Sequence, residues 1–376
     1  MRGDAIGRRL LAAVMALPLL GAPIGSTPVP ARIDDPSVSI APRAVAQKPR
    51  RLFISGHSLT DRPFPDYLAA LVAARGSVLD WDQQQLFGSS LRDRTRGPDG
   101  KDSGYRAGLD RQGWPADVLY ALATGPVRYD ALLLAEQHSL LESLLWKDMV
   151  PSAADYIARF RAASPAGHTY LFASWLNVDD LGDPSRWIAY ERAADRAWQC
   201  AASRIGAVAG APVTIVPAAA ALALLVEQAN SGRLPGIGLS AAQGATTAIF
   251  ADDVHLAPAG IYYVALVTHG ILFGELPAAA WIPPGLLPKD AAALGRVARG
   301  FLGRYSPDQA ASDPAACRAY LGGRFAGQYL DYVRDARWQR EQGVAAHLRW
   351  VRFRLSWPRL LRGTSPANPF ATPPPA

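Results

Sequence analysis

The chain has few of the residues that bind metal ions or build a disulfide framework. Its 376 residues include two cysteines and six histidines, and no group of them has the spacing of metal ligands. We therefore predict neither a metal site nor a cofactor. Cys200 and Cys317 fit an exported protein with at most one disulfide, which would tie the C-terminal part of the chain to the main domain. Two unpaired, buried thiols are the alternative.

Long apolar runs are also scarce, and no stretch after the N-terminal region is long and apolar enough to cross a bilayer. Residues 1–31 place three arginines before an apolar run from Leu10 to Ile24 and end in small residues, which is typical of a cleaved signal peptide. The pair Arg8-Arg9 leaves a twin-arginine signal open, and an uncleaved anchor is the other alternative. Residues 32–48 are rich in Pro, Ala and Ser and are predicted to be a linker. We expect the mature protein to be periplasmic or secreted.

Excess positive charge is absent from most of the chain. The formal net charge is +7, but residues 334–362 alone contain eight arginines against two acidic residues, an excess of six. The rest of the chain is therefore nearly neutral. This distribution argues against a nucleic-acid partner for the main domain.

The basic segment belongs to a C-terminal extension, residues 286–376. This extension is predicted to be helical and to end in a disordered, Pro-rich tail from Pro366 to Ala376. Apolar and aromatic side chains stand among the arginines of residues 334–362, a pattern that suggests an anionic membrane surface or an acidic polysaccharide as a possible partner. The alternative is a helix that packs on the main domain while its arginines remain solvated.

The main domain, residues 49–285, alternates apolar runs with amphipathic stretches. Five runs are predicted to be strands, at residues 52–54, 77–81, 130–135, 169–173 and 213–216. Four stretches are predicted to be helices, at residues 63–74, 153–163, 185–208 and 258–272, and residues 92–115 are expected to form a long polar loop. This order predicts an α/β fold with a mostly parallel sheet and helices on both faces.

One serine stands where the first strand turns toward the first helix. Ser58 follows the run Leu52–Ile54, at the carboxyl edge of the predicted sheet, where open α/β sheets bind their ligands. We take Ser58 as the candidate nucleophile. The adjacent His57 is interpreted as a residue that hydrogen-bonds within the loop rather than as a second base.

A serine hydroxyl needs a base to take its proton and a third group to orient that base. His255 precedes the last predicted helix at the same edge of the sheet, and a tight turn would bring the Asp252 carboxylate to its imidazole. Asp253 is expected to face solvent or cap the helix. The alternative is that Asp252, Asp253 and His255 only cap and satisfy a loop.

Two motifs carry a resemblance to a known family. Gly56-His57-Ser58-Leu59-Thr60-Asp61 and Asp252-x-x-His255-Leu256 resemble the first and fifth blocks of the SGNH (GDSL-like) hydrolase superfamily, in the same order along residues 50–275. The resemblance implies a flavodoxin-like three-layer α/β/α sandwich and a catalytic triad of Ser58, His255 and Asp252. It also implies an oxyanion hole formed by the backbone amides of Ser58 and Gly88 with the side chain of Gln137.

The chain departs from the family pattern at two places. His57 replaces the acidic residue that usually precedes the serine, and the third block, usually Gly-x-Asn-Asp, is Ala135-Glu136-Gln137-His138. Gln137 takes the place of the asparagine, with one more methylene. The loss of an oxyanion donor costs roughly a hundred- to a thousand-fold in rate, so an inactive, glycan-binding relative is one alternative.

Members of the superfamily are esterases and lipases. The resemblance therefore implies an exported serine esterase that hydrolyses short acyl esters, O-acetyl esters above all, with an acylated carbohydrate as the expected substrate. A lipid or aryl esterase held at the membrane surface is the alternative enzyme. His138, Glu136 and Asn177 follow the third and fourth strands and are candidate substrate-binding residues. Trp175 either contacts substrate as well or covers the edge of the core.

Overall fold

The computed structural model describes residues 48–234, 245–276, 281–363 and 368–371. The predicted signal peptide, nearly all of the predicted linker and most of the Pro-rich tail lie outside the described residues. No helix within the described ranges combines the length and the apolar character that a bilayer span requires.

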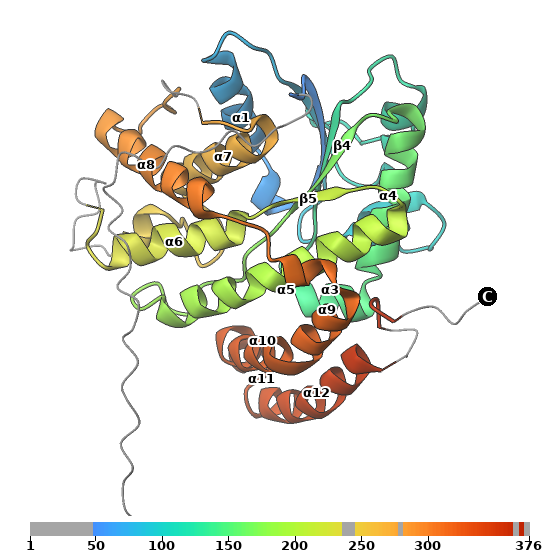
Figure 1. The fold of residues 1–376 in the computed structure, drawn as a ribbon, viewed down its shortest axis with the longest axis vertical. Helices are drawn as coiled ribbons and strands as arrows, with labels where there is room; N and C mark the ends of the chain where they lie inside the picture. Colours follow the sequence, from blue (N-terminus) through green and yellow to red (C-terminus); the bar gives the residue numbers. More distant parts are fainter. Residues whose placement is uncertain (1–47, 235–244, 277–280, 364–367, 372–376) are drawn as a thin grey trace, which may run out of the picture. The chain divides into compact units, whose positions relative to one another are not determined.

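Five strands form one parallel sheet in the order β2-β1-β3-β4-β5 (Figure 1). The strands are β1 (Arg51–Gly56), β2 (Asp80–Gln85), β3 (Ala131–Ala135), β4 (His168–Phe172) and β5 (Val213–Val216). In the register of the sheet, Ile54 of β1 lies opposite Gln83 of β2 and Leu133 of β3. The central β3 is buried along its whole length, as expected of a parallel strand that is covered on both faces.

Helices cover both faces of the sheet, so the predicted α/β class is confirmed (Figure 1). On one face α1 (Phe64–Ala73) packs against α7 (Pro258–Phe273), and on the other α4 (Met149–Ala163) packs against α5 (Ser185–Ala209). α6 (Ala218–Asn230) contacts both α5 and α7. The shorter segments are η1 (Ser58–Thr60), α2 (Leu91–Thr95), η2 (Ser103–Arg106), η3 (Tyr120–Thr124), α3 (Leu140–Trp146) and η4 (Ala245–Ala248).

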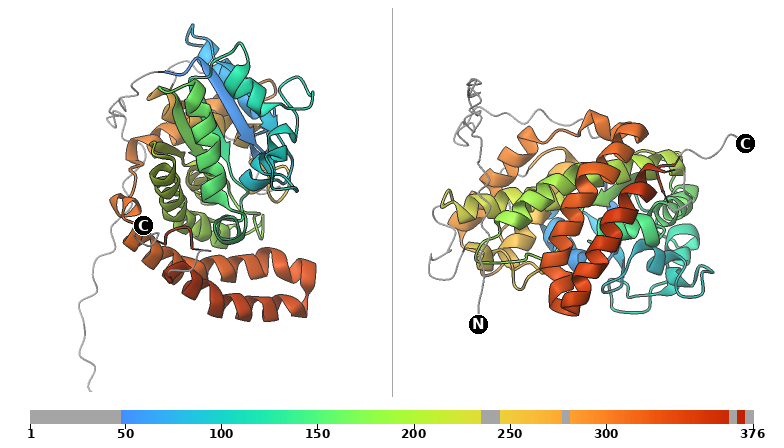
Figure 2. Two further views of the ribbon diagram at one scale, coloured as in Figure 1. Left: turned by 90° about the vertical axis from the view of Figure 1, so that its right-hand side faces the viewer. Right: turned by 90° about the horizontal axis from the view of Figure 1, so that it is seen from below.

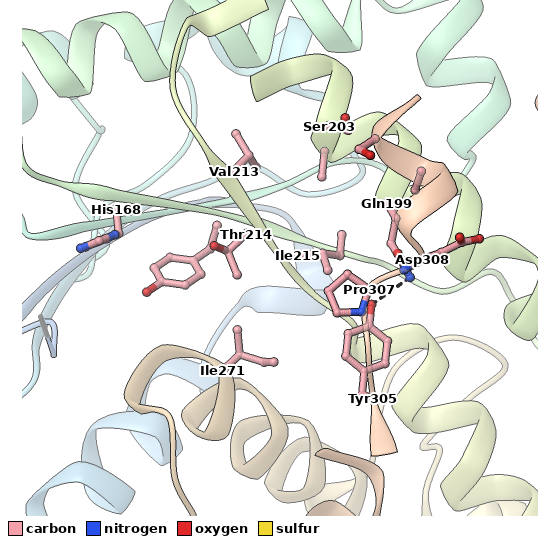
Figure 3. Close-up of a pocket in the computed structure, with 14 residues that line it drawn as sticks. His168, Gln199, Ser203, Val213, Thr214, Ile215, Ile271, Tyr305, Pro307 and Asp308 are labelled. Carbon is pink, nitrogen blue, oxygen red and sulfur yellow. Dashed lines mark hydrogen bonds between the residues drawn. The ribbon is translucent and has the colours of Figure 1, made fainter. Parts of the chain in front are cut away.

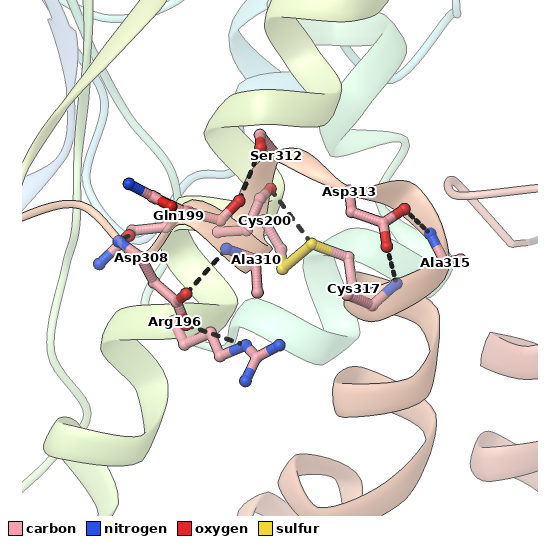
Figure 4. Close-up of a disulfide and its surroundings, with 12 residues drawn as sticks. Arg196, Gln199, Cys200, Asp308, Ala310, Ser312, Asp313, Ala315 and Cys317 are labelled. Atoms are coloured by element: carbon pink, nitrogen blue, oxygen red, sulfur yellow. Dashed lines mark hydrogen bonds and ion pairs between the residues drawn. A yellow bond between two sulfur atoms is a disulfide. The ribbon is translucent and has the colours of Figure 1, made fainter.

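The C-terminal extension is helical, as predicted. Its elements are α8 (Pro288–Arg304), η5 (Gln309–Ser312), α9 (Pro314–Tyr320), η6 (Leu321–Phe325), α10 (Ala326–Val333), η7 (Arg334–Trp338), α11 (Gln339–Gln342) and α12 (Val344–Arg362). α8 packs on α7, whereas α10 lies between α5 and α12 (Figure 2). A disulfide between Cys200 of α5 and Cys317 of α9 joins the extension to the main domain, so the bridged alternative holds (Figure 4).

The second strand differs from its prediction. Residues 77–81 were expected to form it, but β2 runs from Asp80 to Gln85 and includes three glutamines. All three glutamines are buried. The amide of Gln84 has partners, because its Nε2 donates to the carbonyl oxygens of Gly104 at 2.7 Å and Ala107 at 3.1 Å. The same bonds order the loop expected at residues 92–115, which contains α2 and η2.

The tail is also more ordered than predicted where the structure describes it. In residues 368–371 the Phe370 side chain is buried. Its carbonyl oxygen accepts a hydrogen bond from Arg318 at 2.8 Å. The expectation of disorder is therefore wrong for these four residues. Phe370 anchors them because its side chain is buried, and Arg318 of α9 binds its carbonyl oxygen.

Candidate active site

The turn after β1 presents Ser58 at the carboxyl edge of the sheet. Ser58 opens η1, where the Thr60 N–H donates to the His57 carbonyl oxygen at 2.9 Å. The turn needs glycine at position 56, because a Cβ there would lie 1.9 Å from the Thr60 Oγ1. The Ser58 side chain is half-buried. The sequence therefore holds this serine on a short, tightly closed turn.

The loop before α7 joins Asp252 to His255 as the spacing predicts. The Asp252 Oδ2 lies 2.7 Å from the His255 Nδ1, and the Asp252 Oδ1 accepts hydrogen bonds from the backbone N–H groups of Val254 and His255 at 2.8 and 2.6 Å. Burial is the largest single influence and disfavours the charged form of Asp252, but the hydrogen bonds from His255 and Val254 together outweigh it and lower the pKa of Asp252 below its usual value. Asp252 is therefore ionised and orients the imidazole.

Neighbouring segments fix this loop in place. The Trp175 Nε1 donates to the Val254 carbonyl oxygen at 2.8 Å, and the Val178 N–H donates to the Asp253 carbonyl oxygen at 2.6 Å. The Asp253 carboxylate lies 3.5 Å from a guanidinium nitrogen of Arg340 in the C-terminal extension. Asp253 thus pairs with an arginine instead of simply facing solvent, and the extension touches the loop that carries His255.

Ser58 and His255 line the same cavity, of about 360 Å³. Its other lining residues are Leu59, Asp61, Arg62, Pro63, Phe64, Phe87, Trp175, Leu256, Ile261 and Val264, most of them apolar. This volume lies in the range of small-molecule sites. The described residues include no hydrogen bond between Ser58 and His255, and catalytic hydrogen bonds often tighten only once a substrate is bound. Two residues about two hundred positions apart in the sequence therefore line one cavity. Proton transfer between them stays a prediction.

Gly88 and Gln137 contact each other, and neither is among the residues that line this cavity, although Phe87 is. Gly88 has a φ of +63°, a left-handed conformation that favours glycine. The Gln137 Nε2 donates to the Gly88 carbonyl oxygen at 3.1 Å, and the Gln137 Oε1 accepts a hydrogen bond from the Lys147 ammonium. Among the described residues, nothing accepts a hydrogen bond from the backbone N–H of Ser58 or of Gly88. One N–H of the Gln137 amide also remains, since a primary amide carries two.

His57 is a buried, neutral residue that hydrogen-bonds within the loop, as interpreted from the sequence. Its Nε2 lies 2.9 Å from the Glu136 carbonyl oxygen, and its Nδ1 accepts from the Leu59 N–H at 3.4 Å, so these contacts assign the proton to Nε2. Burial, together with the positive charge of Arg94, lowers the pKa of His57 to about 3. His57 therefore ties the turn that carries Ser58 to the end of β3 and is no base at neutral pH.

Glu136 does not line the site, in contrast to the prediction. Its carboxylate is fully buried and accepts from the Gln137 N–H at 2.6 Å, the Ser143 hydroxyl at 3.2 Å and the Leu91 N–H at 3.3 Å. Burial raises its pKa to about 7 against the opposing charge of Arg94. The backbone donors around it hold the carboxylate away from the cavity.

Arg94 is the residue that the sequence did not single out. It is fully buried and donates from its Nε to the Ser55 hydroxyl at 3.0 Å, from its Nη1 to the Ser89 hydroxyl at 2.6 Å, and from its Nη2 to the Ala135 carbonyl oxygen. These partners sit on β1, beside Gly88 and at the end of β3. The only sequence signal was an arginine in a stretch expected to be a loop, which is too common to be informative.

The remaining candidates for substrate binding differ in where the structure places them. His138 is half-buried, and burial, with the charges of Arg337, Lys147 and His255, lowers its pKa to about 4. It is thus a neutral imidazole close to His255. Asn177 is outside the set of cavity-lining residues, and its carbonyl oxygen accepts from the Tyr332 hydroxyl at 2.6 Å. Trp175 both lines the cavity and lies buried at the edge of the core.

A second cavity, of about 620 Å³, lies elsewhere. It is lined by residues at the start of β4 and along β5, such as His168 and Val213, and by the segment after α8 that contains Tyr305 and Asp308 (Figure 3). None of the residues predicted to form a site is among those that line it. Over the described ranges, no three His, Cys, Asp or Glu side chains are grouped so as to hold a metal ion.

Comparisons with known proteins add little to this geometry. No family model and no curated protein matches the chain. A crystal structure of a DUF4886 family protein from Bacteroides uniformis is similar at 15% sequence identity and a TM-score of 0.49, over 68% of this chain and 97% of that one. A likeness at this level says nothing about activity.

Proposed function

We propose that the chain is a serine esterase of the SGNH type that acts through an acyl-enzyme. The observation that carries the proposal is the convergence of Ser58 and the Asp252–His255 pair on one apolar-lined cavity. The unengaged N–H groups of Ser58 and Gly88 support it, because an acyl-transfer site must stabilise an oxyanion.

In the proposed mechanism, His255 takes the proton from Ser58 as the serine oxygen attacks the ester carbonyl. Asp252 holds the imidazole through Nδ1 and stabilises its charged form. The oxyanion accepts hydrogen bonds from the Ser58 and Gly88 amides, with the second N–H of Gln137 as a third donor. His255 then protonates the leaving alcohol, and water, activated by the same base, releases the acyl group.

The cavity favours the acyl side of the substrate as its occupant. Its lining is mostly aliphatic and aromatic, with Phe64, Trp175 and Val264 among the residues. Short acyl esters fit, acetylated carbohydrates included. A volume of about 360 Å³ exceeds what an acetyl group needs, which favours a lipid or aryl ester as the second candidate substrate.

We also propose that the protein is exported and acts in the periplasm or outside the cell. The N-terminal sequence pattern is the basis of this proposal. The disulfide between Cys200 and Cys317 supports it, since disulfides persist mainly in oxidising compartments.

Covalent labelling tests the nucleophile most directly. We expect a fluorophosphonate probe to label the wild type and not Ser58→Ala, whereas Ser77→Ala, at an exposed serine outside the cavity, should label normally. A panel of p-nitrophenyl esters of increasing chain length should show turnover that Ser58→Ala abolishes. Turnover retained in Ser58→Ala would refute the assignment, and absence of both labelling and turnover in the wild type would favour an inactive, ligand-binding relative.

A further inference from the structure

The outermost helix of the extension carries an apolar stripe that faces solvent. Within α12 the four exposed residues of this stripe are Val344 (88% exposed), Leu348 (69%), Val351 (39%) and Leu355 (58%). Their spacing of four, three and four residues places them along one side of a helix. We call these four residues the α12 stripe.

The α12 stripe is not the face by which the helix packs on the protein. That face carries Ala346, Trp357 and Leu361, which are buried. Trp350 donates from its Nε1 to the Asp331 carboxylate of α10 at 2.9 Å. α10 in turn lies between α12 and α5 (Figure 2). The helix therefore has one apolar face that packs on the protein and a second apolar face that is exposed.

The arginines of α12 are of two kinds, three with partners in the protein and two without one among the described residues. α12 contains five arginines and no acidic residue. Arg349 lies 3.6 Å from Glu142, Arg354 lies 2.8 Å from Asp331, and Arg362 donates to the Gly322 carbonyl oxygen at 2.8 Å.

The other two arginines of α12 are Arg352 and Arg359. Both are exposed, and neither has a partner within the described part of the chain. Each lies four residues after a member of the stripe, Leu348 and Leu355 respectively, and therefore beside it on the helix surface.

We propose that the α12 stripe docks on an anionic lipid bilayer. The four aliphatic side chains would enter the boundary between headgroups and acyl chains, and Arg352 and Arg359 would bind headgroup phosphates, as in helices that lie in the membrane plane. This inference does not depend on the proposed esterase activity. The sequence offered either an anionic partner or packing on the main domain for residues 334–362. In this proposal both apply to α12: its aromatic face packs on the protein, and its aliphatic face binds lipid.

Charge complementarity favours lipid over a second copy of the chain. A contact between two α12 helices would set arginines against arginines, and α12 has no carboxylate to neutralise them. The stripe is also a single row of side chains on a convex helix, and none of its members lines any of the cavities described for the protein. A peptide that bound in extended form would need such a groove or pocket on this protein, whereas a bilayer needs only an apolar row with a cationic border.

Vesicle co-sedimentation of the full chain tests the proposal. We expect binding to vesicles that contain phosphatidylglycerol, weak binding to pure phosphatidylcholine, and a decline as salt rises. Leu348→Gln with Leu355→Gln, and separately Arg352→Gln with Arg359→Gln, should each lower the partition coefficient about tenfold or more. Val78→Gln with Arg106→Gln, a matched pair of exposed residues away from α12, should bind as the wild type does.

Three results would overturn the proposal. One is equal binding to anionic and neutral vesicles, and another is unchanged binding by the stripe variants. The third is a wild-type dimer in size-exclusion chromatography that Leu348→Gln with Leu355→Gln dissociates, since the stripe would then bind a second copy. Thermal unfolding of each variant separates lost binding from lost fold, and the exposure of the substituted side chains predicts little change in Tm.

Discussion

Replacement of His57 by glutamine should make the protein less sensitive to acid. His57 is 2% exposed and its pKa is about 3 in the folded protein, against an ordinary value of 6.5. Below pH 6.5 His57 is protonated in the unfolded chain but stays neutral in the folded chain. Falling pH therefore favours the unfolded chain, and the free energy of unfolding decreases. The slope is about 1.4 kcal/mol per pH unit, or about 2.5 kcal/mol between pH 8 and pH 4.5.

Glutamine keeps the hydrogen bond to the Glu136 carbonyl oxygen but does not titrate. At pH 8 we expect His57→Gln to be less stable than the wild type by about 1–2 kcal/mol, because the Leu59 N–H loses its ring acceptor. At pH 4.5 the deficit should shrink by about 2.5 kcal/mol and vanish or reverse. The contributions of Glu136 and other buried groups are common to both proteins and cancel in this difference.

Urea unfolding at the two pH values, followed by tryptophan fluorescence, measures the effect. Thr95→Val is the matched control. Its buried hydroxyl donates to the Leu91 carbonyl oxygen at 2.9 Å, so the variant loses a buried hydrogen bond and no contact with His57. Its deficit should be the same at both pH values. A deficit of His57→Gln that does not change with pH would refute the claim that His57 is held neutral.

Two further predictions concern the oxyanion site and the disulfide. Gln137→Ala should lower kcat for a p-nitrophenyl ester about a hundred-fold with KM little changed, and Lys147→Met should lower it less, because the amide keeps its bond to Gly88; an unchanged rate in Gln137→Ala would show that its amide is no oxyanion donor. Cys200→Ser with Cys317→Ser should lose about 4–5 kcal/mol of unfolding free energy, since the bridge spans 117 residues. Dithiothreitol should lower the urea midpoint of the wild type and leave that variant unchanged, and a wild type that ignores reductant would contradict the bridge.

The sequence was most informative where the physical signal is local. Leu132 to Leu134 are three consecutive leucines in a strand buried on both faces, and such runs identify parallel strands. The Asp252–His255 pair depends on a three-residue spacing within one loop, which a single turn can close. That Ser58 and His255 line one cavity agrees with a topological rule, since ligands of parallel sheets bind at the carboxyl edge. Ser58 follows β1 directly, whereas His255 follows α6 and η4 and lies just before α7.

The sequence was least informative where polar groups are satisfied by distant partners. The prediction misplaced β2 because the polar pair Gln83-Gln84 is typical of a loop. The sequence does not show that the Gln84 amide donates to the carbonyl oxygens of residues 104 and 107, which lie about twenty positions away. Glu136 was taken for a substrate contact because its place after β3 was known and its direction was not. A carboxylate at that position is buried only where hydrogen-bond donors surround it. One of these donors is the backbone N–H of Leu91, 45 positions before Glu136 in the sequence.

Arg94 shows why such a framework matters for the proposed chemistry. A buried guanidinium is costly unless each of its donors has a partner, and those partners exist only when the end of β1, the Ser89 turn and the end of β3 are all in place. The three segments carry, within three residues of these contacts, Ser58, Gly88 and Gln137. The cost of burying this charge is thus offset only when the segments that carry the proposed nucleophile and the proposed oxyanion donors are all in place. The stability of the folded chain and the geometry of the candidate site therefore depend on the same hydrogen bonds.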